Sequence, residues 1–313
     1  MESPLLEPDA PPLPRRAPGE EPRAFRREVN GVTIAGFEWE GGGDPILLVH
    51  ATGFHARVWD EVARRLPLRR VIALDMRGHG RSSKPAPPYA WRLFGEDVSL
   101  VLDDLDLRGI IGVGHSMGGH TIVDAAIRRP QRFASLVLVD PTIFAKRPAA
   151  PGGSAVDTRG NSLDYVSRRR NEWASVEEMV ERFAPRFPFN AWEPQALRDY
   201  ATHGLLPAPG GDGLVLACPP AVEAAVYAGR DTPGSDLLPA LDRVTCPARV
   251  LRARAPEPGE EAAPFTVSPT IPDLAARLPR GVDVPLPHLT HFIPMQAPDL
   301  VARHILMATE AVS

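Results

Sequence analysis

The sequence predicts an α/β fold: a mostly parallel, twisted sheet with helices on both faces and an inserted helical cap. Short apolar runs alternate with segments of helical period along most of the chain, which is the pattern of parallel strands buried on both faces. Between about residues 141 and 245 this alternation gives way to helical segments without clear strands. A chain of 313 residues is long enough for one such core and an insertion.

The first 24 residues are rich in proline and charge and cannot bury enough apolar surface to offset the cost of ordering. We expect residues 1–24 to form a flexible tail. Folding should begin near Phe25, where two strand-like runs flank the dipeptide Asn30-Gly31. Both residues tolerate positive φ, as a two-residue hairpin turn requires, so the chain should enter the sheet through an antiparallel hairpin.

Six apolar runs supply the other expected strands of the core. They are PILLVH (45–50), VIALD (71–75), GIIGVG (109–114), LVLVD (136–140), ARVLRA (248–253) and VDVPLP (282–287). Helices are expected near 56–66, 91–105, 117–129, 271–278 and 298–308. We therefore assign residues 25–140 and 246–313 to the core and residues 141–245 to the cap.

The predicted cap contains a helix start and many aromatic residues. Ser175 and Glu178 form a capping box ahead of a helical segment at 176–183. The aromatic residues of the region are Trp173, Phe183, Phe187, Phe189, Trp192, Tyr200 and Tyr227. They could line an apolar pocket over the sheet or form the core of the cap itself, and the sequence leaves both interpretations open.

Charge and cysteine content limit the partners that the chain is expected to have. The net charge is −4, and no block of lysine and arginine is large enough for nucleic acid. Cys218 and Cys246 lie far apart without a CxxC pattern, so we expect reduced thiols and neither a metal site nor a cofactor. The chain shows neither a signal peptide nor a membrane-length apolar segment, which favours a cytoplasmic protein with no membrane partner.

The stretch GVGHSMGG (112–119) places Ser116 between a predicted strand and a predicted helix. Gly114 and Gly118 leave room for a sharp turn that would hold the serine strained and exposed at the sheet edge. The amide groups of the following helix would face the same point, where they stabilise developing negative charge. Ser116 is the candidate nucleophile; the alternative is a glycine-rich turn with an incidental serine.

Two further stretches occur in the same order and strand context as in a known superfamily. HATGF (50–54) follows the first core strand, and DMRGHGRS (75–82) follows the next. Together with GHSMGG these motifs resemble the α/β-hydrolase superfamily over residues 25–140 and 245–308, specifically the cap-bearing branch of epoxide hydrolases and haloalkane dehalogenases. Those two activities use an aspartate nucleophile where this chain has Ser116, so the resemblance implies ester-type acyl transfer.

The resemblance implies roles for residues of both stretches. The backbone amides of Thr52 and Met117 would form an oxyanion hole, with Ala51 at the position of a usual glycine. His50 could instead simply cap a strand. Asp75 and Arg77 are expected to pair or to bond local backbone, and a catalytic role for His79 is the less favoured interpretation.

A serine hydroxyl needs a histidine that accepts its proton. In the superfamily this histidine follows the last strand, where LPHLTHFIPMQAP (286–298) contains His288 and His291. The stretch HFIPMQAP resembles the family pattern after its histidine, which selects His291 as the base. His288 remains the alternative, and Thr290 replaces the usual preceding glycine.

The carboxylate that supports the histidine is less evident from the sequence. After ARVLRA the position of the usual family aspartate is Pro256, with Glu257 one residue later in an acidic loop. In the dehalogenase-like branch the acid can follow the preceding strand of the sheet, where this chain has Asp140. Pro141 should hold Asp140 extended at the carboxyl edge of the sheet. We assign Asp140 as the acid with Glu257 as the alternative, and Asp140 could also merely turn the chain into the cap.

The sequence thus predicts a serine hydrolase that cleaves a carboxylic ester, lactone or thioester of a small, largely apolar substrate. Because a fold is a weak guide to reaction, C–C bond cleavage, cofactor-free peroxidation, a cyclase or lyase step and a non-catalytic receptor remain alternatives. The run Arg168–Arg170 suggests an anionic substrate, but three consecutive arginines on a helix more often form a solvated face. The oligomeric state is left open.

Overall fold

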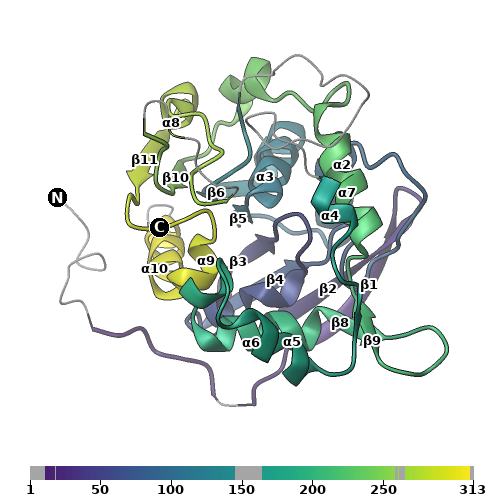
Figure 1. Cartoon of the computed structure of the whole chain (residues 1–313). Coiled ribbons are helices and arrows are strands. Elements are labelled where there is room, and N and C mark those ends of the chain that lie inside the picture. Colours follow the sequence, from purple (N-terminus) through teal and green to yellow (C-terminus); the bar gives the residue numbers. More distant parts are fainter. Residues whose placement is uncertain (1–10, 18, 145–163, 258–259, 261–264, 311–313) are drawn as a thin grey trace.

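The computed structural model describes residues 11–17, 19–144, 164–257, 260 and 265–310. Its main sheet has eight strands in the order β1-β2-β4-β3-β5-β6-β10-β11 (Figure 1). These strands are β1 (Arg23–Val29), β2 (Val32–Trp39), β3 (Gly42–Val49), β4 (Arg69–Leu74), β5 (Ile110–His115), β6 (Phe133–Val139), β10 (Ala248–Arg252) and β11 (Gly281–Pro285). All pairs from β4 to β11 are parallel, and only β2 pairs antiparallel with its neighbours. The predicted α/β fold is confirmed.

The antiparallel entry forms as the sequence predicts. β1 and β2 pair with Val29 opposite Val32, and the two turn residues between them, Asn30 and Gly31, have φ values of 50° and 72°. The last two residues of the expected tail instead belong to the sheet, because β1 begins at Arg23, and residues 11–17 are described. Arg16 is buried there, and its guanidinium donates hydrogen bonds to the carbonyl oxygens of Ala63, Leu66, Arg69 and Glu40.

The helices of the core lie on both faces of the sheet. They are α1 (Asp60–Arg64), α2 (Arg92–Asp104), α3 (Met117–Arg128), α8 (Leu274–Arg277), α9 (Ile293–Gln296) and α10 (Pro298–Glu310). Along β3, Leu47 and Val49 pack in one apolar cluster whereas Ile46 and Leu48 pack in the other. This two-residue alternation is what a strand buried on both faces requires.

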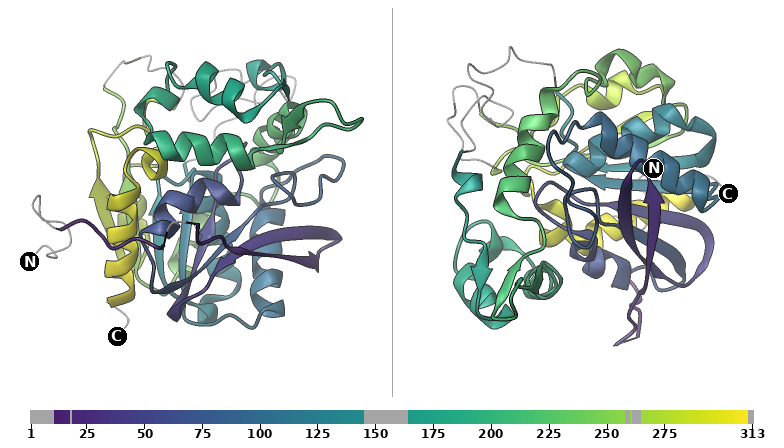
Figure 2. Two further views of the ribbon diagram at one scale, coloured as in Figure 1. Left: turned by 90° about the horizontal axis from the view of Figure 1, so that it is seen from below. Right: turned by 90° about the vertical axis from the view of Figure 1, so that its right-hand side faces the viewer.

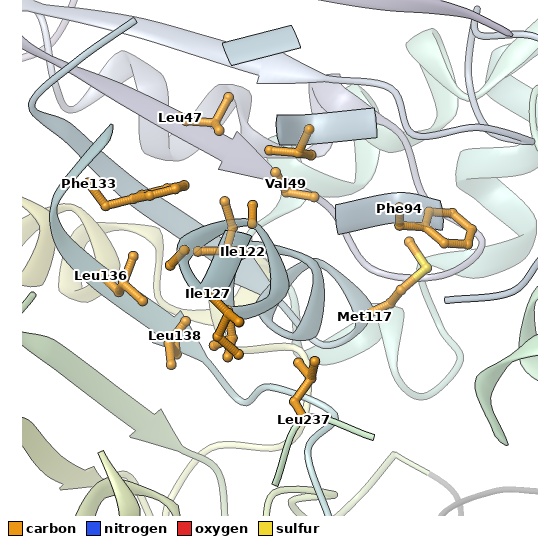
Figure 3. Packing of buried hydrophobic residues seen from close by; sticks show 14 of the residues in the cluster. Leu47, Val49, Phe94, Met117, Ile122, Ile127, Phe133, Leu136, Leu138 and Leu237 are labelled. Carbon is orange, nitrogen blue, oxygen red and sulfur yellow. The ribbon is translucent and has the colours of Figure 1, made fainter. Parts of the chain in front are cut away.

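The first of these clusters packs α3 against the sheet (Figure 3). Ile122 and Ile127 of α3 lie beside Leu136 and Leu138 of β6 in this cluster, and Met117 at the helix start lies near Phe94. Because Met117 follows Ser116 directly, the packing of α3 fixes the position of the candidate nucleophile relative to the sheet.

The inserted region contains helices and a small sheet. Its helices are α4 (Asp164–Ser167), α5 (Val176–Phe183), α6 (Pro194–His203) and α7 (Pro220–Ala228), and the Ser175 hydroxyl accepts the amide hydrogen bond of Glu178 as the capping box predicts. Figure 2 shows this teal and green segment beside the core rather than between its strands. The sequence analysis found no clear strands in this region, but β7 (Glu172–Trp173), β9 (Leu214–Leu216) and β8 (Leu205–Pro207) form a small antiparallel sheet beside the helices.

Within the described residues, no helix is both long enough and apolar enough to cross a membrane. Likewise, no cluster of three or more histidine, cysteine, aspartate or glutamate side chains in the described part of the chain could hold a metal ion. Cys218 and Cys246 are buried free thiols.

Candidate active site

Ser116 lies at the sharp turn between β5 and α3. Its backbone has φ 57° and ψ −118°, a conformation that residues other than glycine rarely adopt. The two flanking glycines are required by close backbone contacts: a Cβ on Gly114 would lie 2.2 Å from the carbonyl oxygen of Gly118, and one on Gly118 would lie 2.1 Å from that of Val49. The turn that the sequence predicts is therefore present and strained.

The structure brings Ser116, His291 and Asp140 together in one hydrogen-bonded series. His291 Nε2 lies 3.0 Å from Ser116 Oγ, and His291 Nδ1 lies 2.7 Å from Asp140 Oδ2. All three residues are buried. Glu257 and His288, the sequence alternatives for the acid and the base, are exposed instead, and the amide of Glu257 donates to the carboxylate of Glu260.

The Asp140 carboxylate is held by donors from the chain that follows β10. Asp140 Oδ1 accepts hydrogen bonds from the Ala253 amide at 3.0 Å and the Ser268 hydroxyl at 2.5 Å, and the Thr270 hydroxyl lies 3.4 Å away. An ionised carboxylate has no proton to donate, so Asp140 acts only as an acceptor here, and His291 donates to it from Nδ1. The chain after β10, where the family usually has its acid, therefore supplies hydrogen-bond donors to Asp140, which follows the neighbouring strand β6.

The backbone of Asp140 differs from the prediction. We expected Pro141 to hold this residue extended, but its φ is +44°, in the left-handed region. The Asp140 amide donates to the carbonyl oxygen of Leu251, and its side chain reaches Ala253 and Ser268. These tertiary hydrogen bonds offset the local preference of a residue before proline.

His291 is fixed from several sides. The Phe265 ring stacks on its imidazole with centroids 5.9 Å apart and planes 20° apart. His115, the residue before Ser116, donates from Nε2 to the carbonyl oxygen of His291 at 2.7 Å. Burial and the nearby His291 lower the pKa of His115 well below its usual value, so the His115 ring stays neutral and acts as a fixed support.

Thr52 and Met117, the predicted oxyanion residues, are both buried, and Thr52 lines the cavity that also contains Ser116 and His291. Among the described residues, no group accepts a hydrogen bond from either backbone amide. Unpaired amides beside a serine hydroxyl are the groups that an oxyanion requires.

The loops HATGF and DMRGHGRS hold each other through two histidines. His50 Nε2 accepts the hydrogen bond of the Met76 amide, and His79 Nε2 accepts that of the Gly53 amide, each at 3.0 Å. The other ring nitrogens, the Nδ1 atoms, donate to backbone carbonyl oxygens. Burial lowers the pKa of both rings, that of His79 to about 4. Neither ring therefore has a free nitrogen for proton transfer, and His50 joins two loops rather than only capping a strand.

Asp75 and Arg77 do not pair with each other. The carboxylate of Asp75 accepts hydrogen bonds from the backbone amides of Ala56 and Arg81, and Arg77 forms a buried ion pair with Asp97. Asp75 thus bonds backbone amides as predicted, whereas the partner of Arg77 is a carboxylate of α2 that the sequence analysis did not name.

A cavity of about 460 Å³ lies over Ser116 and His291. Six of the seven aromatic residues noted in the inserted region line it, together with three phenylalanines of the core: Phe183, Phe187, Phe189, Trp192, Tyr200, Tyr227, Phe54, Phe265 and Phe292. Trp173 is buried behind them with its ring centroid 5.2 Å from that of Phe183. The aromatic residues thus serve as cavity lining and as core packing at the same time.

One ion pair lines the cavity and was not foreseen from the sequence. Arg169 forms an ion pair with Glu223 of α7, and its second terminal nitrogen lies 3.3 Å from the Tyr200 hydroxyl. Of the run Arg168–Arg170, only Arg169 reaches the cavity: Arg168 is exposed, and Arg170 lies over the Trp173 ring. The prediction that the run is a solvated face is therefore wrong for its middle residue.

The residues that surround the site but were not foreseen are Thr142, Ser268, Thr270, Phe265, Arg169 and Glu223. For Thr142 the sequence contains a signal, because a hydroxyl two residues after a candidate acid at a strand end can reach the same edge of the sheet. The others come from loops or helices distant in sequence, and only the folded chain brings them together.

The fold and the site define a protein of the α/β-hydrolase class. Residues 46–304 match the alpha/beta hydrolase family, and the chain belongs to that family. The family and the hydrolase names of its relatives support an enzyme that acts on a small molecule.

The similar proteins include a hydrolase that spans nearly the whole chain. The 2-(acetamidomethylene)succinate hydrolase of Mesorhizobium japonicum is 28% identical over 281 residues, which are 90% of this chain and 92% of that protein. The solved structure of E-2-(acetamidomethylene)succinate hydrolase has a TM-score of 0.69 at 25% identity and covers 92% of this chain and 99% of its own. The thioesterase domain of the curacin biosynthetic pathway shares the fold, with a TM-score of 0.70 at 23% identity over 91% and 99% of the two chains.

Proposed function

We propose that this protein is a serine hydrolase that cleaves a carboxylic ester, lactone or thioester through an acyl-enzyme on Ser116. The observation that carries the proposal is the hydrogen-bonded series from Ser116 through His291 to Asp140 at the floor of an aromatic cavity. No metal or cofactor is needed for this chemistry, since the series contains a nucleophile, a base and a carboxylate that orients the base.

The first half of the reaction forms the acyl-enzyme. Ser116 Oγ attacks the carbonyl carbon of the substrate while its proton moves to His291 Nε2. The imidazolium that forms is stabilised by the Asp140 carboxylate, and the oxyanion accepts hydrogen bonds from the amides of Thr52 and Met117. His291 then gives the proton to the leaving alcohol or thiol as the bond from the carbonyl carbon to that group breaks.

The second half uses water as the nucleophile. His291 takes a proton from the water as its oxygen bonds to the acyl carbon, and returns the proton to Ser116 Oγ as the acyl–oxygen bond breaks. The acid product leaves and the resting site is restored.

The lining of the cavity favours a small, largely apolar substrate, held beneath the described part of the proposed cap, residues 164–245. Its volume of about 460 Å³ lies in the range of small-ligand sites, and aromatic rings make up most of its wall. Arg169 and Glu223 form the only ion pair among its described lining residues, and their opposite charges cancel. A neutral substrate with one hydrogen-bonding group therefore fits these residues better than a dicarboxylate does.

A second candidate is hydrolysis of an N-acyl dicarboxylate, which the name of the Mesorhizobium relative suggests and the likeness over 90% of this chain favours. A substrate panel separates the two. It contains neutral aryl and alkyl esters, a lactone, a thioester, 2-(acetamidomethylene)succinate and a β-diketone as a test of C–C cleavage.

The nucleophile is tested by labelling the full chain with a fluorophosphonate and locating the adduct by mass spectrometry. We expect a single adduct on Ser116, loss of labelling in Ser116→Ala, and turnover of neutral esters. An unlabelled Ser116 in folded protein would rule out the serine mechanism. Saturable binding of a panel member without turnover would instead favour a receptor.

A further inference from the structure

Ser116 Oγ has a second hydrogen-bond partner that the reaction described above does not use. Thr142 Oγ1 lies 3.0 Å from Ser116 Oγ, and the Thr142 amide donates to the carbonyl oxygen of Ser116, also at 3.0 Å. Thr142 is 8% exposed. Two hydrogen bonds between the same two residues fix the threonine hydroxyl at the reacting oxygen.

The direction of the hydroxyl–hydroxyl bond follows from the other bonds of the series. Asp140 only accepts, so His291 carries its proton on Nδ1 and presents a bare Nε2 to Ser116. The single Ser116 proton is therefore donated to His291. The bond between the two hydroxyls can then form only with Thr142 as the donor and Ser116 Oγ as the acceptor.

We propose that Thr142 is a fourth catalytic residue, whose donated hydrogen bond stabilises negative charge on Ser116 Oγ; the inference rests on the proposed serine mechanism. When His291 removes the serine proton, charge develops on Oγ and the bond from Thr142 becomes charge-assisted and stronger. In the second half of the reaction the same oxygen is the leaving group, and charge develops on it again. Thr142 keeps its own proton throughout both steps.

Thr142 contacts the nucleophile away from the substrate. It is not among the described residues that line the 460 Å³ cavity, and it lines a separate cavity of about 30 Å³. Loss of its hydroxyl should therefore lower kcat and the rate of covalent modification without changing KM.

The test compares Thr142→Val, Thr142→Ala and Thr142→Ser in the full chain, with Thr121→Val as the matched control. Thr121 is fully buried in α3, and its hydroxyl has no hydrogen-bond partner among the described residues, so its loss should leave these rates unchanged. The measurements are kcat and KM for a neutral aryl ester, the rate constant of fluorophosphonate modification at Ser116, and the thermal unfolding midpoint.

We expect Thr142→Val and Thr142→Ala to lower kcat and the modification rate roughly 10- to 100-fold, the effect of losing one hydrogen bond to a charged group. Thr142→Ser should keep both rates within about threefold of the wild type, since it retains the donor. Wild-type rates in Thr142→Val, or rates in Thr142→Ser as low as those in Thr142→Val, would overturn the proposal. If Thr142→Val does not fold, equal rates in Thr142→Ala and Thr142→Ser would overturn it. An unmodified Ser116 in the wild type would refute the serine mechanism itself and is a separate outcome.

Discussion

His79 Nε2 accepts a hydrogen bond from the Gly53 amide at 3.0 Å and so connects the loop after β4 to the loop that contains Thr52. The ring has no contact with Ser116 or His291 among the hydrogen bonds and ring contacts of the described residues. The role of His79 in the DMRGHGRS stretch is therefore structural: its ring holds the HATGF loop, which contains the candidate oxyanion residue Thr52, in place.

His79→Phe should keep an aromatic ring at this position while it removes the acceptor of the Gly53 amide. We expect kcat/KM to fall about tenfold and the free energy of unfolding to fall by about 1 kcal/mol, because a half-buried amide loses its partner. Steady-state kinetics and urea unfolding measure both effects. His288→Gln is the control, since His288 is exposed; unchanged kinetics in His79→Phe would show that the loop keeps its position without this bond.

Asp140→Asn should remove the acceptor that fixes the tautomer of His291. Under the proposed serine mechanism we expect kcat to fall on the order of 10⁴-fold. Glu257→Gln, at the other candidate acid, should leave kcat unchanged because Glu257 is exposed and bonds only locally. The reverse pattern in the two variants would transfer the acid role to Glu257.

The sequence predicts the core better than the inserted region for a physical reason. Parallel strands buried on both faces give apolar runs that local sequence reveals, and all six runs form strands. The strands β8 and β9 have three residues each, too few for a periodic pattern, and form a hairpin around Gly210, Gly211 and Gly213 with positive φ. The glycine cluster was the available signal for this hairpin.

In the candidate site, too, local motifs could be predicted from the sequence, whereas long-range contacts could not. The motifs around Ser116 and His291 are local and can be read from the sequence. The left-handed backbone of Asp140 depends on Ala253 and Ser268, more than a hundred residues away. A pair such as Arg169 with Glu223 cannot be read from the sequence either, because nothing local distinguishes a half-buried arginine from its exposed neighbours.

The Arg169–Glu223 pair should be strongly coupled. Arg169→Met leaves the Glu223 carboxylate buried, and we expect it to lower the free energy of unfolding by about 3 kcal/mol. The double variant Arg169→Met with Glu223→Gln should lose less than the sum of the single variants. Urea unfolding of the four proteins measures the coupling. The exposed pair of Arg277 with Asp273 provides the control, for which we expect no measurable change; strict additivity at Arg169 and Glu223 would contradict the prediction.

Buried histidines should make the protein sensitive to acid. Burial lowers the pKa of His55 to about 3 and that of His79 and His120 to about 4. At these three positions the unfolded chain, in which histidine titrates near 6.5, therefore binds more protons than the folded chain. Their contribution to the free energy of unfolding should be fully present well above pH 6.5 and be lost as the pH decreases towards 4, whereas Asp60, whose pKa burial raises to about 7, contributes in the opposite direction.

The contribution of one histidine can be isolated with His120→Gln. Gln can still donate to the Ser235 carbonyl oxygen, which His120 Nε2 contacts at 2.7 Å, but it does not titrate. We expect the loss of stability between pH 6.5 and 4 to shrink by roughly 3 kcal/mol relative to the wild type. Unfolding curves across this range measure it, and an unchanged slope in His120→Gln would show that His120 is not responsible.

Relief of backbone strain at Ser116 should stabilise the folded chain. Ser116→Gly removes the side chain from a backbone with φ 57°, and we expect about 1 kcal/mol of added stability together with complete loss of turnover. Ser116→Ala is the control because it keeps the Cβ and thus the strain. A lower unfolding midpoint for Ser116→Gly than for Ser116→Ala would show that the turn stores no strain.

Left-handed backbone is concentrated around the site: of the five described non-glycine residues with positive φ, Ser116, Asp140 and Phe265 lie at or beside His291. Activity and thermal stability should therefore oppose each other in this protein. Random selection for heat resistance would tend to accumulate glycine or asparagine at these three positions and yield robust but inactive variants. Thermostable, active variants should be sought by leaving these three positions fixed and changing the surface.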